Sequence, residues 1–308
     1  MSLILGSYNE RVALTTVPVF VLESNKLCLN CVYNFGSGFF ICYKDLFFFI
    51  TVDHVVHYSD FNEGFRSNID YTPWVYASLI RSDRLSLMIP MLQSTFFSSA
   101  NFQDICQNHP HRLGDGIENL ANPSWDALED NELASVAIPD LHDIAFANIP
   151  PIILKNVYSF LYPYSFDWRI PIRLERIQTI YEYEFGEMTE DKVYHTGGFT
   201  NNHISVTGEY HCEFRFLTNL RFLRRQEKSA TNPDELIWLE CPEIFTEKEL
   251  VGISGAPLFD ENERLCGIVC RTQHRDHSIA IFPLQPLLHL IDYEININLT
   301  LMPKTHSE

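Results

Sequence analysis

Short apolar stretches alternate with polar or glycine-containing turns through most of the chain. In the N-terminal part, residues 12–22 are β-branched and apolar, and residues 39–43 form another apolar stretch after Gly36-Ser37-Gly38. Residues 46–52 are continuously apolar, which is typical of a strand that is buried on both faces. We therefore predict successive short β-strands, with the glycine segment as a break between two of them.

The same pattern continues in the C-terminal half, where strand-length apolar stretches are again separated by turn residues. Strands are predicted at residues 193–199, 203–206, 212–217, 236–239 and 278–283, and a basic exposed loop at 221–228. Residues 287–291 are apolar enough to form a closing helix near the C-terminus. About a dozen short strands with one late helix indicate an all-β fold.

The composition fits a soluble globular protein. The chain has 308 residues, of which 46% are hydrophobic and 20% charged, which suits one large core or two smaller ones. The formal net charge of -18 leaves no basic footprint for nucleic acid or an anionic membrane. The N-terminus lacks the basic and apolar regions of a signal peptide, and the longest apolar stretch is far shorter than a membrane span. We therefore expect a cytoplasmic protein that binds neither nucleic acid nor membrane.

Eight cysteines in a chain of this length do not make a disulfide scaffold, and in the cytoplasm we expect them to be reduced. Cys28 with Cys31, Cys266 with Cys270, and residues 106–111 contain side chains that could be metal ligands. Both cysteine pairs lie in apolar strand-like stretches, where free cysteine commonly acts as a small buried hydrophobe. We expect no metal and no organic cofactor.

A serine lies between two glycines in the sequence Gly252-Ile253-Ser254-Gly255-Ala256-Pro257, directly before the apolar residues 258–259. Glycine tolerates backbone angles that other residues disfavour, and Gly252 could expose its N–H to an oxyanion. Pro257 stiffens the start of the following strand. Such a turn can present an activated hydroxyl, although Gly, Ser and Pro clusters also form ordinary turns.

Three segments together resemble the trypsin-like (chymotrypsin-fold) serine proteases of the bacterial intracellular type. One is the serine turn at 252–257 with the apolar strand after it. Another is Gly36-Ser37-Gly38, followed by the buried strand 46–52 and then by His54 before two valines. The third is Asp143-Ile144-Ala145, an aspartate at the start of an alternating apolar strand. Their order along the chain, His, Asp and Ser, is also that of the chymotrypsin arrangement.

The resemblance implies two antiparallel six-stranded β-barrels of the chymotrypsin type with a short C-terminal helix. Residues 1–150 are then the N-terminal barrel, which carries the histidine and the aspartate and contains an insertion at residues 59–130. Residues 151–308 are the C-terminal barrel, which carries the serine and the closing helix.

The resemblance also implies a serine endopeptidase. Ser254 attacks a peptide carbonyl, His54 moves the proton, and Asp143 orients the imidazole. The N–H groups of Gly252 and Ser254 bind the developing oxyanion. The alternative function is a catalytically silent protease-fold module that binds a protein partner without cutting it.

The acid of this triad has rivals nearby. Glu132 precedes an apolar stretch of the same shape, and Asp130 lies beside it, so either could replace Asp143. We prefer Asp143 because Ile-Ala follows it directly and because aspartate is the usual acid of the family. Asp53 directly precedes His54 and is expected to point away from the imidazole.

The resemblance places the primary substrate pocket just before the serine and just after residues 267–269. One wall is expected to contain Lys248, Glu249 and Val251, and the other Cys270, Arg271 and Thr272. Lys248 stands where an aspartate would select basic residues, so we do not expect cleavage after Lys or Arg. Ile253 stands where zymogen-activated members carry an aspartate, so we expect control by a protein partner or by the ordering of a loop, and not by N-terminal cleavage. The expected partners are a protein or peptide substrate and an activating protein.

Overall fold

The structure is a computed structural model, described for residues 7–22, 32–56, 74–80, 85–90, 143–149, 161–163, 178–204, 210–227 and 235–301. The strands are β1 (Thr16–Leu22), β2 (Val32–Tyr43), β3 (Leu46–Thr51), β4 (Trp74–Ile80), β5 (Leu85–Pro90), β6 (Ala145–Asn148), β7 (Leu161–Pro163), β8 (Ile180–Tyr181), β9 (Val193–Ile204), β10 (Tyr210–Gln226), β11 (Leu236–Glu240), β12 (Pro257–Asp260), β13 (Leu265–Gln273) and β14 (Ser278–Pro283). The helices are α1 (Ser7–Thr15), α2 (Asp53–Val56), α8 (Leu284–Leu301) and the 3-10 helices η5 (Glu182–Glu184) and η6 (Glu247–Leu250). Most of the described chain is therefore β-structure, as predicted.

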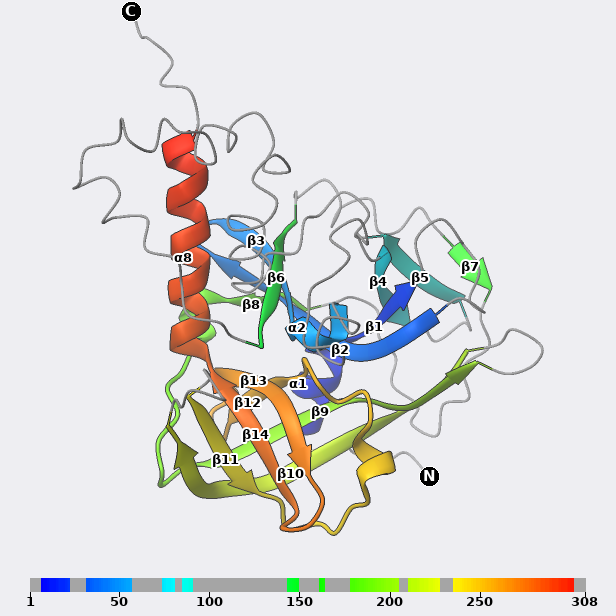
Figure 1. The fold of residues 1–308 in the computed structure, drawn as a ribbon, viewed down its shortest axis with the longest axis vertical. Coiled ribbons are helices and arrows are strands. Elements are labelled where there is room, and N and C mark those ends of the chain that lie inside the picture. Colours follow the sequence, from blue (N-terminus) through cyan, green and yellow to red (C-terminus); the bar gives the residue numbers. More distant parts are fainter. Residues whose placement is uncertain are drawn as a thin grey trace, which may run out of the picture.

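Two β-structures make up the fold. Strands β9 to β14 form a closed barrel in the order β10-β11-β14-β13-β12-β9, and Figure 1 shows it below the other strands. Strands β1 to β8 form an eight-stranded sheet in the order β6-β3-β2-β1-β4-β5-β7, with β8 parallel to β2. The resemblance implied two closed barrels. Only the C-terminal one is closed among the described residues, because the end strands β6 and β7 pair with β3 and β5 and not with each other.

Strand β2 continues through Gly36-Ser37-Gly38, so the break predicted there is wrong. The glycines serve packing instead of ending the strand. A Cβ atom on Gly38 would lie 2.3 Å from Cζ of Phe49, and one on Gly36 would lie 2.6 Å from the methyl groups of Val55. The missing side chains therefore let neighbouring apolar residues pack directly on the backbone of β2.

Two helices also differ from the prediction. The N-terminal part of the predicted strand 12–22 belongs to α1, where Val12 is buried and packs on β9. The closing helix α8 is longer than residues 287–291, and Leu287 and Ile291 are buried on one side of it. Tertiary packing, which the local pattern does not contain, selects these helices. No helix in the described ranges is both long and apolar enough to cross a membrane.

The loop predicted at residues 221–228 is largely a strand. β10 extends to Gln226 and pairs with β11, with Arg225 opposite Ile237. Arg221, Arg224 and Arg225 are exposed, which explains why the segment looks like a loop in sequence. One face of a barrel strand can remain in water while the other packs inside.

The apolar core has two parts. One cluster combines residues of the sheet with residues on the outside of the barrel, including Phe40, Phe146 and Phe282. The other contains residues from every strand of the barrel: Tyr194, Leu217, Leu239, Leu258, Val269 and Ile281. The sheet and the barrel are therefore packed against each other through a shared core, while the barrel keeps an interior of its own.

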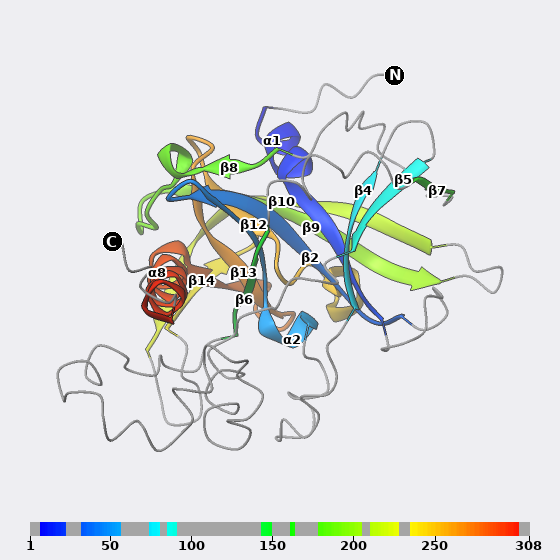
Figure 2. The same ribbon diagram turned by 90° about the horizontal axis from the view of Figure 1, so that it is seen from above.

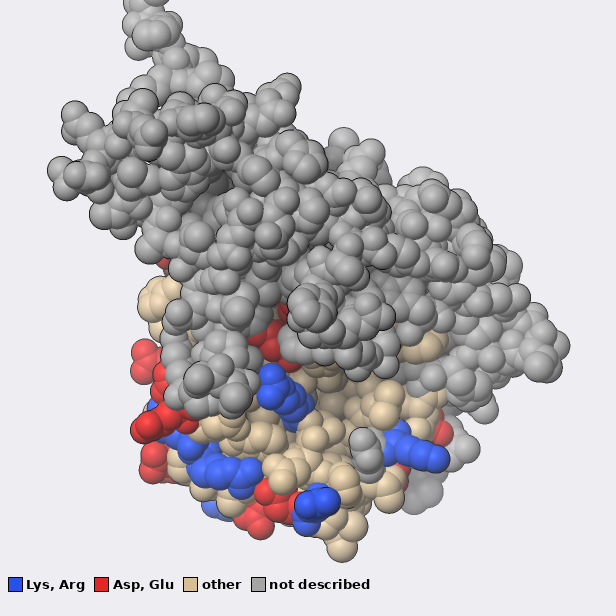
Figure 3. Space-filling view, viewed as in Figure 1, with Lys and Arg blue, Asp and Glu red and all other residues tan. Residues whose placement is uncertain are grey.

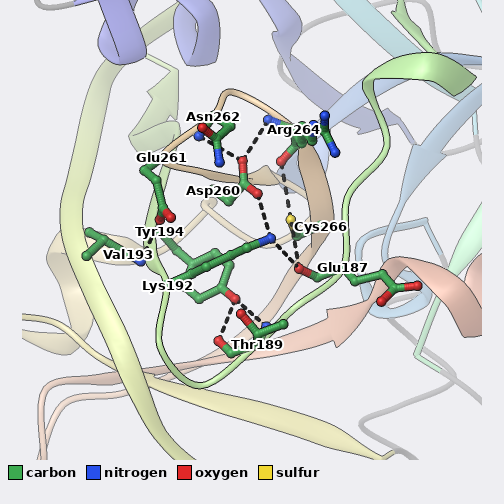
Figure 4. Close-up of polar contacts among 10 residues, drawn as sticks. All are labelled: Glu187, Thr189, Lys192, Val193, Tyr194, Asp260, Glu261, Asn262, Arg264 and Cys266. Atoms are coloured by element: carbon green, nitrogen blue, oxygen red, sulfur yellow. Dashed lines mark hydrogen bonds and ion pairs between the residues drawn. The ribbon is translucent and has the colours of Figure 1, made fainter.

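A polar cluster joins the segment before β9 to the β12–β13 hairpin (Figure 4). The fully buried Asp260 carboxylate accepts hydrogen bonds from the backbone N–H groups of Asn262 and Arg264, both at 3.0 Å. It also pairs with Lys192 Nζ at 2.9 Å, and Lys192 donates to the carbonyl of Glu187 at 3.1 Å. Because β12 directly follows the serine turn, this cluster holds the hairpin that continues from that turn.

We expect Asp260→Ala to lower the free energy of unfolding by about 3 kcal/mol, because it removes the fully buried carboxylate that accepts two backbone N–H groups and pairs with the Lys192 ammonium. Urea unfolding measures the change. Glu190→Ala is the control, since its ion pair with Arg225 is exposed and should contribute at most about 1 kcal/mol. Equal losses in the two variants would contradict the role given to Asp260.

Candidate active site

His54 lies in α2, which follows β3 almost directly. Asn34 of β2 holds this short helix, because its Nδ2 donates to the carbonyls of His54 at 3.0 Å and Val55 at 2.8 Å. Gly36 of the same strand lies under Val55. β2 therefore positions the histidine in two ways. The amide of Asn34 holds α2, and Gly36 leaves room for Val55 because it has no side chain.

Asp143 lies directly against His54. Its carboxylate oxygens are 3.0 and 2.9 Å from Nδ1 of the imidazole, and Oδ1 also accepts the backbone N–H of His54 at 3.1 Å. Asp143 precedes β6, in which Ala145 pairs with Thr51 at the end of β3. The start of β6 therefore lies beside α2, as Figures 1 and 2 show. The structure thus brings together two of the residues that the sequence singled out.

The surrounding charges set the protonation of His54, whose side chain is 27% exposed. Burial lowers the pKa of His54, but the charge and hydrogen bond of Asp143 and the charge of the buried Asp53 outweigh it, so the pKa is raised above its ordinary value. The charge of Arg271 opposes this rise. Because Asp143 occupies Nδ1, Nε2 is the nitrogen that can exchange a proton with a neighbouring group.

The serine turn follows η6 and bends sharply. The φ angles of Gly252 and Gly255 are 100° and 91°, in the region that favours glycine. A Cβ atom on Gly255 would also lie 1.9 Å from the carbonyl oxygen of Ser37 and 2.6 Å from Oγ1 of Thr51. The backbone of the turn at Gly255 therefore packs directly against β2 and β3.

The N–H groups of this turn divide into two kinds. Those of Ile253, Gly255 and Ala256 donate to the carbonyls of Leu250, Val269 and Ile253 at 3.0, 2.8 and 3.0 Å. Those of Gly252 and Ser254 have no hydrogen-bond acceptor among the described residues. These two N–H groups are the donors expected for an oxyanion, and the turn leaves both of them available.

Cys270 of β13 connects the serine with the aspartate. Ser254 Oγ donates to the carbonyl of Cys270 at 3.3 Å, and Cys270 Sγ lies 3.9 Å from the carbonyl oxygen of Asp143. On the other side, the N–H of Ser37 donates to the carbonyl of Ser254 at 2.8 Å, while Asn34 on the same strand holds α2. The three segments that carry the predicted residues therefore meet between β2 and β13.

The reactivity of Ser254 is expected to rise with pH, with a midpoint above the ordinary histidine pKa of about 6.5. A histidine acts as a base only when neutral, and its raised pKa keeps it protonated to higher pH. The midpoint is measured from the rate at which a fluorophosphonate probe labels the protein at different pH values. Asp53→Asn removes a negative charge and should lower the midpoint, whereas Arg271→Gln should raise it. Shifts in the same direction would contradict this account.

The predicted pocket residues occupy different environments. Lys248 and Val251 are exposed at η6, Glu249 is half-buried there, Cys270 is buried, and Arg271 and Thr272 are half-buried at the end of β13. Cys270 is 1% exposed, so its backbone carbonyl rather than its thiol faces the serine. Val251, at 58% exposure, is an apolar side chain in water beside the turn. Figure 3 shows basic and acidic side chains interspersed over the described residues visible on one face.

Glu249 is held within its own segment. Hydrogen bonds from the N–H and hydroxyl of Thr246, at 2.6 and 2.8 Å, and an ion pair with Arg215 at 3.0 Å lower the pKa of Glu249 to about 2. These contacts cap η6, the helix that leads into the serine turn. Glu249 therefore supports the turn, and Lys248 beside it carries the exposed charge.

Several sequence candidates lie outside the described residues: the rival acids Asp130 and Glu132, the cysteines Cys28 and Cys31, and residues 106–111. The other cysteine pair does not converge, because Cys266 packs inside the barrel and Cys270 in the core shared with the sheet. Burial raises the pKa of Cys266 to about 12. In the part of the chain that the structure describes, no group of three or more His, Cys, Asp or Glu is placed to hold a metal ion.

Three residues shape the site although the sequence pattern indicates no role for them. Asn34 holds the histidine helix, Ser37 holds the serine turn, and Thr51 Oγ1 donates to the carbonyl of Ser37 at 2.8 Å. The only sequence signal was the placement of Ser37 between two glycines. Asn34 and Thr51 are ordinary strand residues in the sequence.

Comparisons with known proteins give structural matches only. No protein-family model matches the chain, and no curated protein matches it in sequence. Matching solved structures include the active form of the Rv3671c protease from M. tuberculosis, with 12% identity over 93% of this chain and 83% of that one and a TM-score of 0.46. The tobacco vein mottling virus protease matches with 9% identity over 91% of this chain and 80% of that one, with a TM-score of 0.40. Deg5 matches with 13% identity over 92% of this chain and 94% of that one, with a TM-score of 0.43. We therefore base the function on the geometry of the site.

Proposed function

We propose that this protein is a serine endopeptidase that hydrolyses peptide bonds through an acyl-enzyme intermediate. The observation that carries the proposal is the contact of the Asp143 carboxylate with Nδ1 of His54 at 2.9 Å. This contact fixes the tautomer that leaves Nε2 as a base for a hydroxyl group. The available N–H groups of Gly252 and Ser254 support the same reaction, because acyl transfer needs donors for a developing oxyanion.

The reaction follows from the roles of these groups. Ser254 Oγ forms a bond to the carbonyl carbon of the peptide while its proton passes to Nε2 of His54. The tetrahedral oxyanion accepts hydrogen bonds from the N–H groups of Gly252 and Ser254. His54 then gives the proton to the departing amine as the C–N bond breaks. Water cleaves the acyl ester by the same route and regenerates the serine.

Control by a protein partner or by loop ordering, and not by N-terminal cleavage, is part of the proposal. Ile253 is fully buried among apolar residues of the barrel interior, at the position where zymogen-activated proteases carry an aspartate. An isoleucine cannot form an ion pair with a newly made N-terminus. The site also carries Lys248 where an aspartate would select basic residues, which supports substrates other than those cut after Lys or Arg.

A fluorophosphonate probe tests the proposal. Such a probe forms a covalent bond with an activated serine, so the mass of the protein should increase and peptide mapping should place the adduct on Ser254. Ser254→Ala should abolish labelling. A proteome-derived peptide library, read by mass spectrometry, then identifies the bonds that are cut. Absence of labelling and of cleavage in the unmodified protein, with and without candidate partners, would favour the silent binding module.

A further inference from the structure

Ser37 makes an unusual set of contacts for a strand residue. Its side chain is fully buried, and Oγ donates to the carbonyl of Gly252 at 2.9 Å while accepting the N–H of Phe199 at 3.0 Å. Its N–H donates to the carbonyl of Ser254 at 2.8 Å, and its carbonyl accepts the hydroxyl of Thr51. Ser37 thus ties the sheet, the barrel strand β9 and the serine turn together at one point.

The end of the β2–β3 ladder makes these contacts possible. The pairing of β2 with β3 runs only as far as Phe39 opposite Ile50, so it stops before Ser37. The N–H and carbonyl of Ser37 instead bond to the carbonyl of Ser254 and the hydroxyl of Thr51. The ladder hydrogen bonds are therefore replaced at this residue by one bond to the turn and one to a side chain of β3.

These contacts fix the orientation of the peptide groups in the turn. A peptide is planar, so its carbonyl and its N–H point in opposite directions. Ser37 Oγ holds the carbonyl of Gly252, and the N–H on the same peptide, that of Ile253, points to Leu250. Ser37 N–H holds the carbonyl of Ser254 in the same way, with the N–H of that peptide pointing to Val269.

The two peptide groups held by Ser37 enclose the one that carries the N–H of Ser254. The bond to the Gly252 carbonyl also helps to fix the backbone conformation of Gly252, which has a φ of 100°. If the Gly252 carbonyl lost its partner, the peptide could rotate, because glycine has no side chain to oppose it. The contact that helps to fix the orientation of the Gly252 and Ser254 N–H groups would then be lost.

From these contacts we propose that Ser37 is a positioning residue for acyl transfer: its hydroxyl holds the serine turn with the oxyanion donors of Gly252 and Ser254 aligned. The inference rests on the proposed function. Ser37 acts through the turn and does not touch the reacting atoms. Its effect is therefore on the transition state, in which the oxyanion forms, more than on substrate binding.

The test is Ser37→Ala, which removes the hydroxyl and keeps the backbone bonds of residue 37. We expect kcat to fall on the order of 10- to 100-fold with KM within about twofold, a smaller loss than removal of an oxyanion donor. Thr16→Ala is the matched control. Thr16 also has a buried hydroxyl, which donates to the carbonyl of Val12 at 2.8 Å and lies 3.2 Å from that of Gly197 in β9, and these bonds do not reach the serine turn.

Both variants are assayed well below their unfolding temperatures, with peptides that the unmodified protein cuts. A folded Ser37→Ala with kcat within threefold of the unmodified protein, or an equal loss in Thr16→Ala, overturns the proposal. If Ser37→Ala does not fold, Ser37→Cys replaces it, since a thiol is a weak donor, and the same fall in kcat is expected. Failure of the proposed function looks different, because the unmodified protein then shows no Ser254-dependent cleavage, and this overturns both inferences.

Discussion

Ser254→Ala is expected to reduce peptide-bond turnover about 10⁶-fold, and His54→Ala should reduce it by a similar factor. A serine hydroxyl is a weak nucleophile without a base, and the base has no function without the hydroxyl. The two residues therefore act as a unit, and the double variant should lose little more than either single one. The measurement is kcat/KM for a peptide identified in the library digest.

Asp143→Asn should reduce kcat by about 10⁴-fold, because an amide can favour the wrong imidazole tautomer while keeping the geometry. The control is His289→Ala, which removes an exposed histidine of α8 and should leave kcat/KM unchanged. A residual rate within tenfold of the unmodified protein in Ser254→Ala or His54→Ala would remove the assignment of the active site.

Gly255→Ala is expected to lower the free energy of unfolding by about 4 kcal/mol. Alanine is disfavoured at a φ of 91°, and its Cβ would lie 1.9 Å from the carbonyl oxygen of Ser37. That oxygen belongs to the backbone of β2, so no side-chain rotation can relieve the contact. The turn must move away from β2, and activity should be lost together with stability. Urea unfolding and fluorophosphonate labelling measure the two effects.

Asp45→Ala separates the two causes of this effect. Asp45 also has a positive φ, of 61°, but it is exposed in the turn between β2 and β3. Alanine there suffers the backbone penalty without the contact with β2, so we expect a loss of about 1 kcal/mol. If Gly255→Ala lowered the free energy of unfolding no more than Asp45→Ala does, the result would contradict the close packing of the turn on β2.

Local patterns in the sequence predicted much of the β-structure and the residues that could do chemistry. The continuous apolar run of β3 and the apolar stretch of β14 are strands in the structure. Asp143 does contact His54, at the start of a strand as expected. These features could be predicted because alternation, glycine placement and residue type are properties of a few neighbouring positions.

Predictions that depended on distant contacts were less successful. Gly36-Ser37-Gly38 looked like a break but is the middle of β2, because its pairing with β1 and the space left for Val55 and Phe49 favour an extended backbone. The helical start of the chain and the strand order of the N-terminal sheet likewise depend on packing between remote segments. Short apolar stretches of this kind suit several pairings equally well.

By itself, the sequence determined which residue types were available for acyl transfer, and that Ser254 lies on a turn and Asp143 before a strand. Only the tertiary structure decided that β2 would hold both the histidine helix, through Asn34, and the serine turn, through Ser37. The hydroxyl of Ser37 and the carbonyl of Gly252 are 215 positions apart in the chain. No periodicity encodes such a contact, because it exists only after the sheet and the barrel have packed against each other.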